Sequence, residues 1–257
     1  MLDSLLPLVQ IPFAQQVTLA GMRVHVPGPL PIRLSVVMGN LRMQRMLDSL
    51  LHPGAIVIDV GANIGYNTLY AAHCVGPQGR VYALEPAQDN LTVLYSNIFA
   101  NQLRNVLVLP YAAGGTVGIR EFYIRGDVSA VNSLFHDNFY AEITDKVEVL
   151  TAPLDDLLSI TPDLVKIDVE GGELDVLRGM TRMLQSPALR LIIEWHPTLQ
   201  QAAGHAPAQL PRYLMDQGFT LRLVTHTHTR ALHPSGIASI ATQLLDARRP
   251  VELLATR

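Results

Sequence analysis

The 257-residue chain has little of what several common functional classes require. Its single cysteine, Cys74, cannot form a disulfide within the chain, which agrees with a reducing, cytoplasmic location. Only 16% of the residues are charged, 19 basic against 22 acidic, with no basic stripe, so we expect no nucleic-acid partner. No apolar run reaches the roughly 18 residues that span a bilayer, so we also expect no transmembrane segment.

What the chain does have, from residue 55 onward, is an alternation of apolar runs and helical patterns. Strands are predicted at 55–60, 80–85, 105–110, 163–168, 189–195, 219–225 and 250–255, and helices at 66–75, 88–100, 173–185 and 208–217. This alternation predicts an α/β fold whose mostly parallel sheet is covered by helices on both faces. Residues 111–150 look less regular. We predict one domain over 46–257, preceded by a small extension over 1–45 with a hairpin at 17–26.

The most informative segment reads Ile-Val-Ile-Asp-Val-Gly-Ala-Asn-Ile-Gly over residues 56–65. An apolar strand ends in Asp59, a turn of small residues follows, and a helical pattern begins. Further along the chain the next strand ends in Glu85, where a doubly wound sheet holds a ribose diol. The sequence therefore predicts a nucleoside-binding site at the carboxyl edge of the sheet.

Two residues of this loop argue against a dinucleotide. Asn63 stands where the G-x-G-x-x-G fingerprint needs a glycine, so that the backbone can approach a pyrophosphate. Asp59 would repel that phosphate, because two unit charges about 4 Å apart repel by roughly 4 kcal/mol at an effective dielectric near 20. S-adenosylmethionine fits better, since it carries an ammonium, a sulfonium and a ribose but no phosphate. A nicotinamide-dependent oxidoreductase is the weaker alternative.

A second acidic motif, Lys-Ile-Asp-Val-Glu-Gly-Gly-Glu, occupies residues 166–173. Its three carboxylates repel one another unless a cation or a proton lies among them. Glu173 has an ordinary explanation, because an acid near a helix N-terminus is favoured by the helix dipole. Asp168 ends a strand, and we expect it at the ligand-binding edge beside Asp59.

The strand over 189–195 brings two more candidates, Glu194 and His196, which point to the same side of an extended segment. His196 titrates near neutral pH and is a candidate base for a substrate hydroxyl, although a histidine that caps the following turn is an alternative. Asp168, Glu194 and His196 could instead hold a hard divalent cation, but the spacing gives this little support and we predict no metal site. Asn132 and Ser133 suit either a loop over a pocket or a simple turn.

Together the two motifs resemble the FkbM-type family of S-adenosylmethionine-dependent methyltransferases, which belongs to class I, over roughly residues 45–225. The resemblance lies in residues 57–66, 79–86, 97–101, 112–114 and 165–173. Gly115 departs from it, because the family often has an acidic residue there. The first block marks only the class, whereas the Lys-Ile-Asp-Val-Glu-Gly block is much more particular. The resemblance implies a Rossmann-like, seven-stranded sheet with a reversed last strand. It also implies methyl transfer, usually to a hydroxyl of a sugar, glycolipid or polyketide-type molecule.

On this basis we expect the first loop to hold the methionine end of the cofactor, with Thr68 at its carboxylate and Glu85 at both ribose hydroxyls. Pro86 and Ala113 would flank the adenine. The predicted cofactor-binding residues are Asp59, Gly61, Ala62, Asn63, Gly65, Thr68, Glu85, Pro86, Ala113 and Asp168. The predicted catalytic residues, with His196 or Glu170 as the base, are Asp168, Glu170, Glu194 and His196.

The acceptor stays open at this point. The same fold methylates nitrogen or proteins, and a methyltransferase-like protein that only binds a partner is a further alternative, which the intact acidic residues argue against. Residues 1–45 and 226–257 match nothing in the family. We expect them to face the substrate or to form a homo-oligomer.

Overall fold

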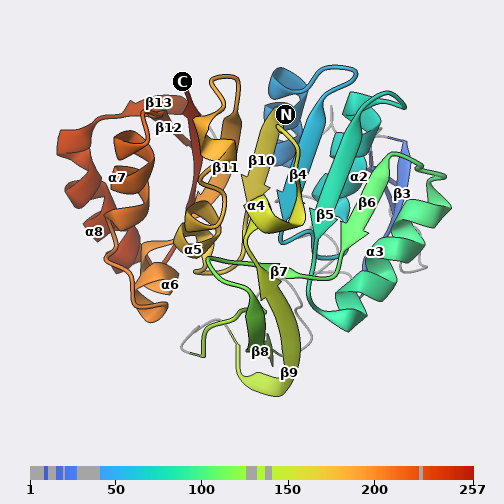
Figure 1. The fold of residues 1–257 in the computed structure, drawn as a ribbon, viewed down its shortest axis with the longest axis horizontal. Helices are drawn as coiled ribbons and strands as arrows, with labels where there is room; N and C mark the ends of the chain where they lie inside the picture. The colour runs from blue at the N-terminus through green and yellow to red at the C-terminus, as the bar shows by residue number, and fades with distance from the viewer. Residues whose placement is uncertain are drawn as a thin grey trace. The chain divides into compact units, whose positions relative to one another are not determined.

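The computed structural model describes residues 9–10, 16–19, 21–27, 41–125, 132–136, 141–225 and 228–257. The chain divides into two compact units, unit 1 over Met1–Leu109 and unit 2 over Pro110–Arg257 (Figure 1). Among the described residues, no helix combines the length and the apolar character needed to cross a membrane.

Unit 1 is built on three parallel strands connected by helices. Its elements are β1 (Val9–Gln10), β2 (Gln16–Leu19), β3 (Met22–His25), helical residues 41–50, β4 (Ile56–Val60), α2 (Tyr66–Val75), β5 (Arg80–Leu84), α3 (Gln88–Ala100) and β6 (Val106–Leu109). β4 pairs with β5 and β5 with β6, both in parallel, because α2 and α3 carry the chain back between strands. β4, α2, β5, α3 and β6 agree with the sequence prediction to within two residues.

A small antiparallel sheet in unit 1 is attached to α3. β2 pairs with β3, which confirms the predicted hairpin, and β1 pairs with β2. Asn97 accepts the N–H of His25 at 2.7 Å and donates to its carbonyl at 3.2 Å, and Asn101 does the same for Arg23 at 2.9 and 2.6 Å. Two asparagines one helical turn apart therefore pair with β3 as a neighbouring strand would.

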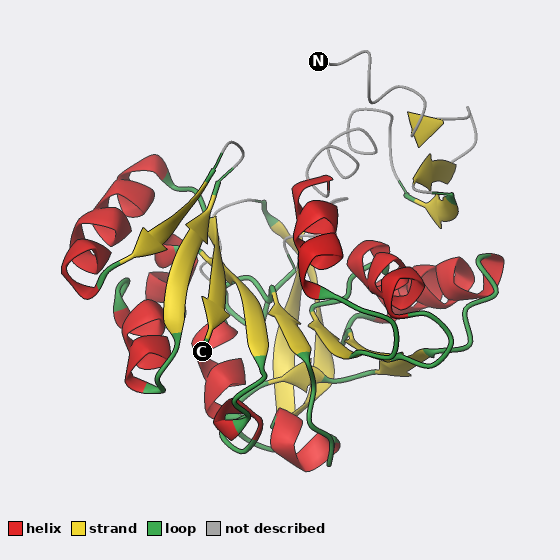
Figure 2. Cartoon of the chain, turned by 90° about the horizontal axis from the view of Figure 1, so that it is seen from above, coloured by secondary structure: helices red, strands yellow, loops and turns green. Residues whose placement is uncertain are grey.

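Unit 2 contains the remaining strands, and Figure 2 shows helices packed beside the strands of the fold. Its elements are β7 (Ala112–Ala113), β8 (Gly118–Arg125), β9 (Ile143–Ala152), α4 (Leu154–Leu157), β10 (Leu164–Ile167), α5 (Glu173–Arg178), η3 (Met183–Gln185), β11 (Arg190–Trp195), α6 (Pro197–Ala202), α7 (Gln209–Asp216), β12 (Thr220–Val224), β13 (Thr229–Leu232), η4 (Pro234–Gly236), α8 (Ile237–Ala247) and β14 (Val251–Thr256). β10 and β11 are parallel, and β14 runs antiparallel to both β11 and β12. The last strand is therefore reversed, as the resemblance implies. β13, which the sequence did not predict, adds to β12.

The stretch that looks irregular in the sequence forms a sheet of its own. β8 and β9 make a long antiparallel ribbon, green in the lower part of Figure 1, and β7 pairs with β9 in parallel. Only Phe122 and Arg125 of β8 are buried. A ribbon with so few buried positions lacks the apolar alternation that identifies a strand from sequence.

The helix predicted over 173–185 ends at Arg178. At Gly179 a Cβ would lie 2.1 Å from the carbonyl oxygen of Gly114, which follows β7. The backbone after β7 and the end of α5 thus touch at a point where no side chain fits. The Gly179 carbonyl accepts the N–H of Asp155 at 3.0 Å, so α4 also joins this contact.

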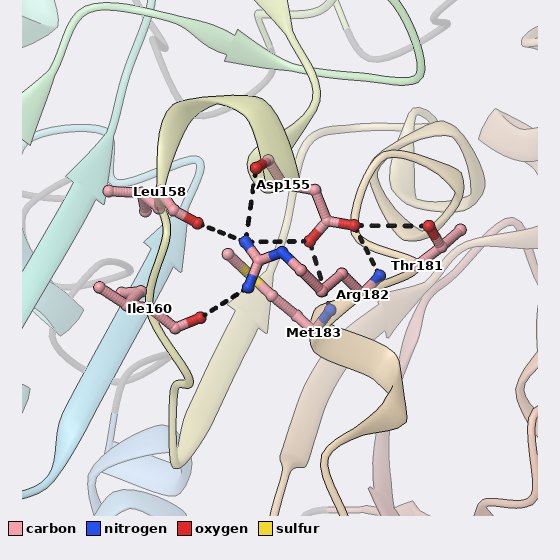
Figure 3. Close-up of polar contacts among 6 residues, drawn as sticks. All are labelled: Asp155, Leu158, Ile160, Thr181, Arg182 and Met183. Atoms are coloured by element: carbon pink, nitrogen blue, oxygen red, sulfur yellow. Dashed lines mark hydrogen bonds and ion pairs between the residues drawn. The ribbon is translucent and has the colours of Figure 1, made fainter.

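Beyond Gly179 the chain turns, and one ion pair with its hydrogen bonds holds the turn (Figure 3). The Asp155 carboxylate accepts the N–H of Arg182 at 2.6 Å and that of Met183 at 3.3 Å. The Arg182 guanidinium lies 3.6 Å from that carboxylate and donates to the carbonyls of Leu158 at 2.6 Å and Ile160 at 3.3 Å. One arginine thereby connects the turn to the residues after α4.

We expect Gly179→Ala to destabilise the protein by about 1–3 kcal/mol, because the new methyl group overpacks the contact with the Gly114 carbonyl. Gly115→Ala is the matched control, since its Cβ would meet nothing nearer than 3.7 Å and should change stability by less than about 0.5 kcal/mol. Urea unfolding measures both. Equal stability of the two variants would contradict this account of the helix end.

Candidate active site

The loop between β4 and α2 is held by its own backbone. The N–H groups of Gly61 and Ala62 donate to the Leu84 carbonyl at 3.0 and 2.9 Å. Asn63 has a φ of 52°, in the left-handed region where asparagine is tolerated, and its Oδ1 accepts the N–H of Ile64 at 2.6 Å. The residue that excludes a dinucleotide fingerprint is therefore the one whose side chain closes the turn.

Gly65 is required where this loop enters α2. Its φ is 91°, and a Cβ there would lie 2.4 Å from a methyl of Leu94 on α3. Asn97, also on α3, donates to the Ile64 carbonyl at 2.8 Å. Helix α3 thus packs directly on the loop and holds it in place.

Asp59 at the end of β4 is buried and paired with Thr68, whose hydroxyl donates to its carboxylate at 2.6 Å. From the sequence we expect Thr68 to donate to the carboxylate of the cofactor. A hydroxyl can donate one hydrogen bond, and that of Thr68 is donated to the Asp59 carboxylate. In this structure Thr68 therefore orients Asp59, and its contact with the cofactor stays a prediction.

Glu85 lies on the same side of unit 1 as the loop and is only 4% exposed. One carboxylate oxygen accepts the N–H of Asn63 at 2.8 Å, and the other accepts the N–H of Ala87 at 2.9 Å and the amide of Asn90 at 3.1 Å. Burial raises the pKa of Glu85, and these three hydrogen bonds oppose the rise. Three donors leave one further acceptor position, so accepting both ribose hydroxyls requires one donor to be exchanged.

Unit 2 carries the second motif on a tight turn after β10. The Asp168 carboxylate lies 3.3 Å from the ammonium of Lys166, which is buried. Glu170 has a φ of 57° and Gly171 of 111°, and a Cβ on Gly171 would lie 2.9 Å from the Leu199 carbonyl oxygen. Close packing against α6 therefore requires the glycine, and Glu170 is held in a conformation that non-glycine residues rarely adopt.

Glu173 closes this turn from inside. It is 0% exposed, and one of its oxygens accepts the N–H of Val169 at 3.2 Å and that of Gly171 at 3.0 Å. Burial raises the pKa of Glu173 to about 7 in spite of these bonds. It stands at the start of α5, as the ordinary explanation expects, and its carboxylate is bonded to the preceding turn.

Three of the predicted catalytic acids lie together in unit 2. Carboxylate oxygens of Asp168, Glu170 and Glu194 lie within 4.8 Å of one another. Burial, and then the charge of Asp168, raises the pKa of both Glu170 and Glu194 well above the ordinary value. Among the described residues these three acids are the set that could hold a cation. The set contains Glu170 in place of His196, which the sequence analysis named as the third possible ligand. Shared protons are the other way to relieve the repulsion.

His196 does not fit the role of base. It is 0% exposed, so an acceptor in solution cannot reach it, and burial lowers its pKa to about 4. It stands at the N-cap of α6, where its carbonyl accepts the N–H of Gln200 at 3.0 Å. The alternative interpretation, a histidine that caps the following turn, is right about its position, but its side chain forms no cap hydrogen bond.

Arg125 is the residue of this region that the sequence did not reveal. It ends β8, it is fully buried, and its charge lowers the pKa of Glu170. It lies in no motif, and its strand is not recognisable from the pattern. Its neighbour Ser133 donates to the Glu170 carbonyl at 2.8 Å, which places the Asn132–Ser133 segment against the acidic turn.

Comparison with known protein families places both motifs, the loop after Asp59 and the acidic turn at 166–173, in one domain. The model of the FkbM methyltransferase domain matches residues 59–221, more than half of the chain, and includes both motifs. The chain belongs to the FkbM methyltransferase family. It therefore carries a methyltransferase domain that depends on S-adenosylmethionine, with the Rossmann-like class I fold.

Individual relatives are distant. Methyltransferase 1 of Beauveria bassiana is 27% identical over 146 residues, 49% of this chain and only 58% of that protein. The hexuronic acid methyltransferase AglP of Haloferax volcanii is 29% identical over 190 residues, 72% of this chain and 71% of the relative. A solved structure from Clostridium thermocellum, named as an rRNA methylase, has a TM-score of 0.50 at 8% identity, over 84% of this chain and 93% of that chain. That likeness shows the fold alone.

Burial of His196 makes the stability of this FkbM-family domain depend on pH. The unfolded imidazole binds a proton below its ordinary pKa of 6.5, whereas the folded one does so only near 4. Stability from the neutral His196 is therefore complete above 6.5 and is lost as the pH falls toward 4. His196→Gln cannot titrate, so between pH 7 and pH 5 it should lose less stability than the wild type in urea unfolding.

The same variant tests the role of base. We expect His196→Gln to retain turnover, in contrast to the roughly 10²–10⁴-fold loss that follows removal of a general base. A loss of that size with intact cofactor affinity would restore His196 as the base.

Proposed function

We propose that this domain transfers the methyl group of S-adenosylmethionine to a hydroxyl of a sugar, glycolipid or polyketide-type small molecule. The observation that carries the proposal is Glu170, a carboxylate with raised pKa held among other acids on the turn after β10. A hydroxyl must lose its proton as it is methylated, whereas a neutral amine already offers a lone pair. A built-in proton acceptor therefore favours oxygen over nitrogen. The name of AglP, a hexuronic acid methyltransferase, supports the saccharide class.

Unit 1 supplies the cofactor contacts in this proposal. Asp59, held by Thr68, attracts the ammonium of the methionine end, and the backbone of residues 61–65 approaches it closely because the loop is small. Glu85 accepts from the ribose. The predicted contacts of Pro86 and Ala113 with the adenine, and of Asp168 with the cofactor, belong to the same proposal.

Most of the rate comes from alignment, because the sulfonium methyl is already activated and needs only an oxygen placed in line with it. The base adds roughly 10²–10⁴-fold. Glu170 suits this task because burial and the neighbouring charge of Asp168 raise its pKa, which makes its ionised carboxylate a stronger proton acceptor. Its left-handed backbone is a strained conformation of the kind that is retained at functional sites.

The proposal is tested by supplying S-adenosylmethionine with a labelled methyl group and a panel of neutral sugars, hexuronic acids, polyketide alcohols and primary amines. Products are identified by mass and by the chemical shift of the new methyl group. An oxygen-bound methyl on a sugar or polyketide alcohol is expected. Methyl groups found only on amines or on protein would overturn the proposal.

Glu170→Gln should lower kcat by roughly 10²–10⁴-fold and leave the affinity for S-adenosylhomocysteine unchanged. Glu121→Gln is the matched control, because Glu121 is an exposed acid on β8, paired with Lys146 at 2.5 Å. Full activity of Glu170→Gln would remove it from the role of base. Loss of cofactor affinity would show a structural role instead.

The affinity for S-adenosylhomocysteine should depend on the ionisation of Glu85. Only the ionised carboxylate accepts freely from the ribose, so affinity falls as the pH drops through the pKa of Glu85. Burial places that fall above the ordinary value of 4.5. Glu85→Gln should bind about 10–100-fold more weakly at neutral pH and lose this pH dependence, as titration calorimetry measures. The same pH dependence in both proteins would assign it to another group.

A further inference from the structure

Residues 132–136 form a short bridge between β8 and the acidic turn. Ser133 pairs with Tyr123 of β8 through both backbone hydrogen bonds, at 2.8 and 3.2 Å. On the other side the Ser133 hydroxyl donates to the Glu170 carbonyl at 2.8 Å. The ring of Phe135 lies so near Gly172 that a Cβ there would be 3.3 Å from it. The bridge therefore contacts the turn both at Glu170 and two residues beyond it.

Arg125 holds this bridge in place. Its backbone N–H donates to the side chain of Asn132 at 2.8 Å, and one guanidinium nitrogen donates to the carbonyls of Phe135 at 2.7 Å and His136 at 2.8 Å. Arg125 is 0% exposed. Burying a guanidinium is costly unless its N–H groups are bonded, so the carbonyls of the bridge and the side chain of Arg125 depend on each other.

The direction of the Glu170 carboxylate follows from these contacts. Its backbone is left-handed, a conformation that costs about 1–2 kcal/mol for a residue with a Cβ, and it persists only where the surroundings enforce it. Two hydrogen bonds constrain the backbone of Glu170. Ser133 donates to the Glu170 carbonyl, and the N–H of the next residue, Gly171, donates to Glu173. One of these two constraints comes from the bridge, which Arg125 and the Ser133–Tyr123 backbone pair both fasten to β8.

We propose that Arg125 is the positioning residue for Glu170, because it fastens residues 132–136 against the acidic turn and so sets the direction of that carboxylate. The link to catalysis rests on the proposed function, whereas the positioning itself is a property of unit 2. The positive charge of Arg125 also acts on Glu170, by favouring its ionised form. Burial, Asp168 and Glu173 raise the pKa of Glu170, and Arg125 and Lys166 lower it. The charge of Glu170 also raises the pKa of Glu194, the third acid of the cluster.

The first test compares Arg125→Met with Arg125→Lys on an acceptor that the wild type methylates. For Arg125→Met we expect kcat to fall about 10–100-fold, the KM for S-adenosylmethionine to stay the same, and the acidic limb of the kcat profile to move up by about one pH unit. Arg125→Lys should return the acidic limb to its wild-type position without restoring full kcat, because lysine lacks the planar fork whose second nitrogen donates to the Tyr123 carbonyl at 3.5 Å.

Two further variants separate position from charge. Ser133→Ala keeps the positive charge but removes the bond to the Glu170 carbonyl, so kcat should fall while the acidic limb stays in place. Lys146→Met removes an exposed positive charge from β9 and should change neither. If Arg125→Met loses thermal stability while its remaining activity keeps the wild-type kcat and acidic limb, the role of Arg125 is structural and the proposal is wrong.

A titration without cofactor or acceptor distinguishes failure of this inference from failure of the proposed function. Carboxyl carbon NMR of glutamate-labelled protein, with the Glu170 signal assigned by its absence in Glu170→Gln, should show its midpoint about one pH unit higher in Arg125→Met than in wild type. An unmoved midpoint overturns the inference even if the enzyme is active. A moved midpoint with no methylated hydroxyl product overturns only the proposed function.

Discussion

Carboxylates taken out of water are the constraint on which both units depend. An ionised acid in a protein interior must receive hydrogen bonds or a positive charge, or else it takes up a proton. Asp59 receives the hydroxyl of Thr68, and Glu173 receives two N–H groups of the turn beside it. Glu85 accepts hydrogen bonds from three donors, one of them the N–H of Asn63 in the loop between β4 and α2. The loops of this protein are shaped largely by the need to bring these donors to these acids.

The supply of donors also separates the acids by role. Glu85, with three donors, closes the loop that it faces and keeps one acceptor position for a ligand. Glu173, fully enclosed with two donors, serves the turn and has a pKa near 7. Glu170 lies among like charges, and its pKa is raised well above the ordinary value. Identical side chains thus become a candidate ligand acceptor, a structural acid within a turn and a candidate base through their surroundings alone.

Much of this could be predicted from particular residues. The sequence predicts β4, β5 and β10 correctly, with Asp59, Glu85 and Asp168 at or just after their ends. Parallel strands that are buried on both faces appear in a sequence as apolar runs bounded by turns. The β8–β9 ribbon is missed because it is mostly exposed, so its few buried residues give no regular alternation of buried and exposed positions. The early end of α5 is missed because Gly179 meets Gly114, a contact between segments far apart in the chain. Arg125 is missed because it lies in no motif and its strand, β8, is not recognisable from the sequence pattern.

By itself, the sequence determined the family, the cofactor class and the acidic residues that define the two motifs. Those properties depend on residue type at short spacing, which is local and survives in the linear order. Only the tertiary structure decided that Thr68 donates to Asp59, that His196 is enclosed and that the Glu170 carbonyl accepts a hydrogen bond from Ser133. Burial and hydrogen-bond partners decide the chemistry of an ionisable group, and both are set by segments that meet only when the chain has folded.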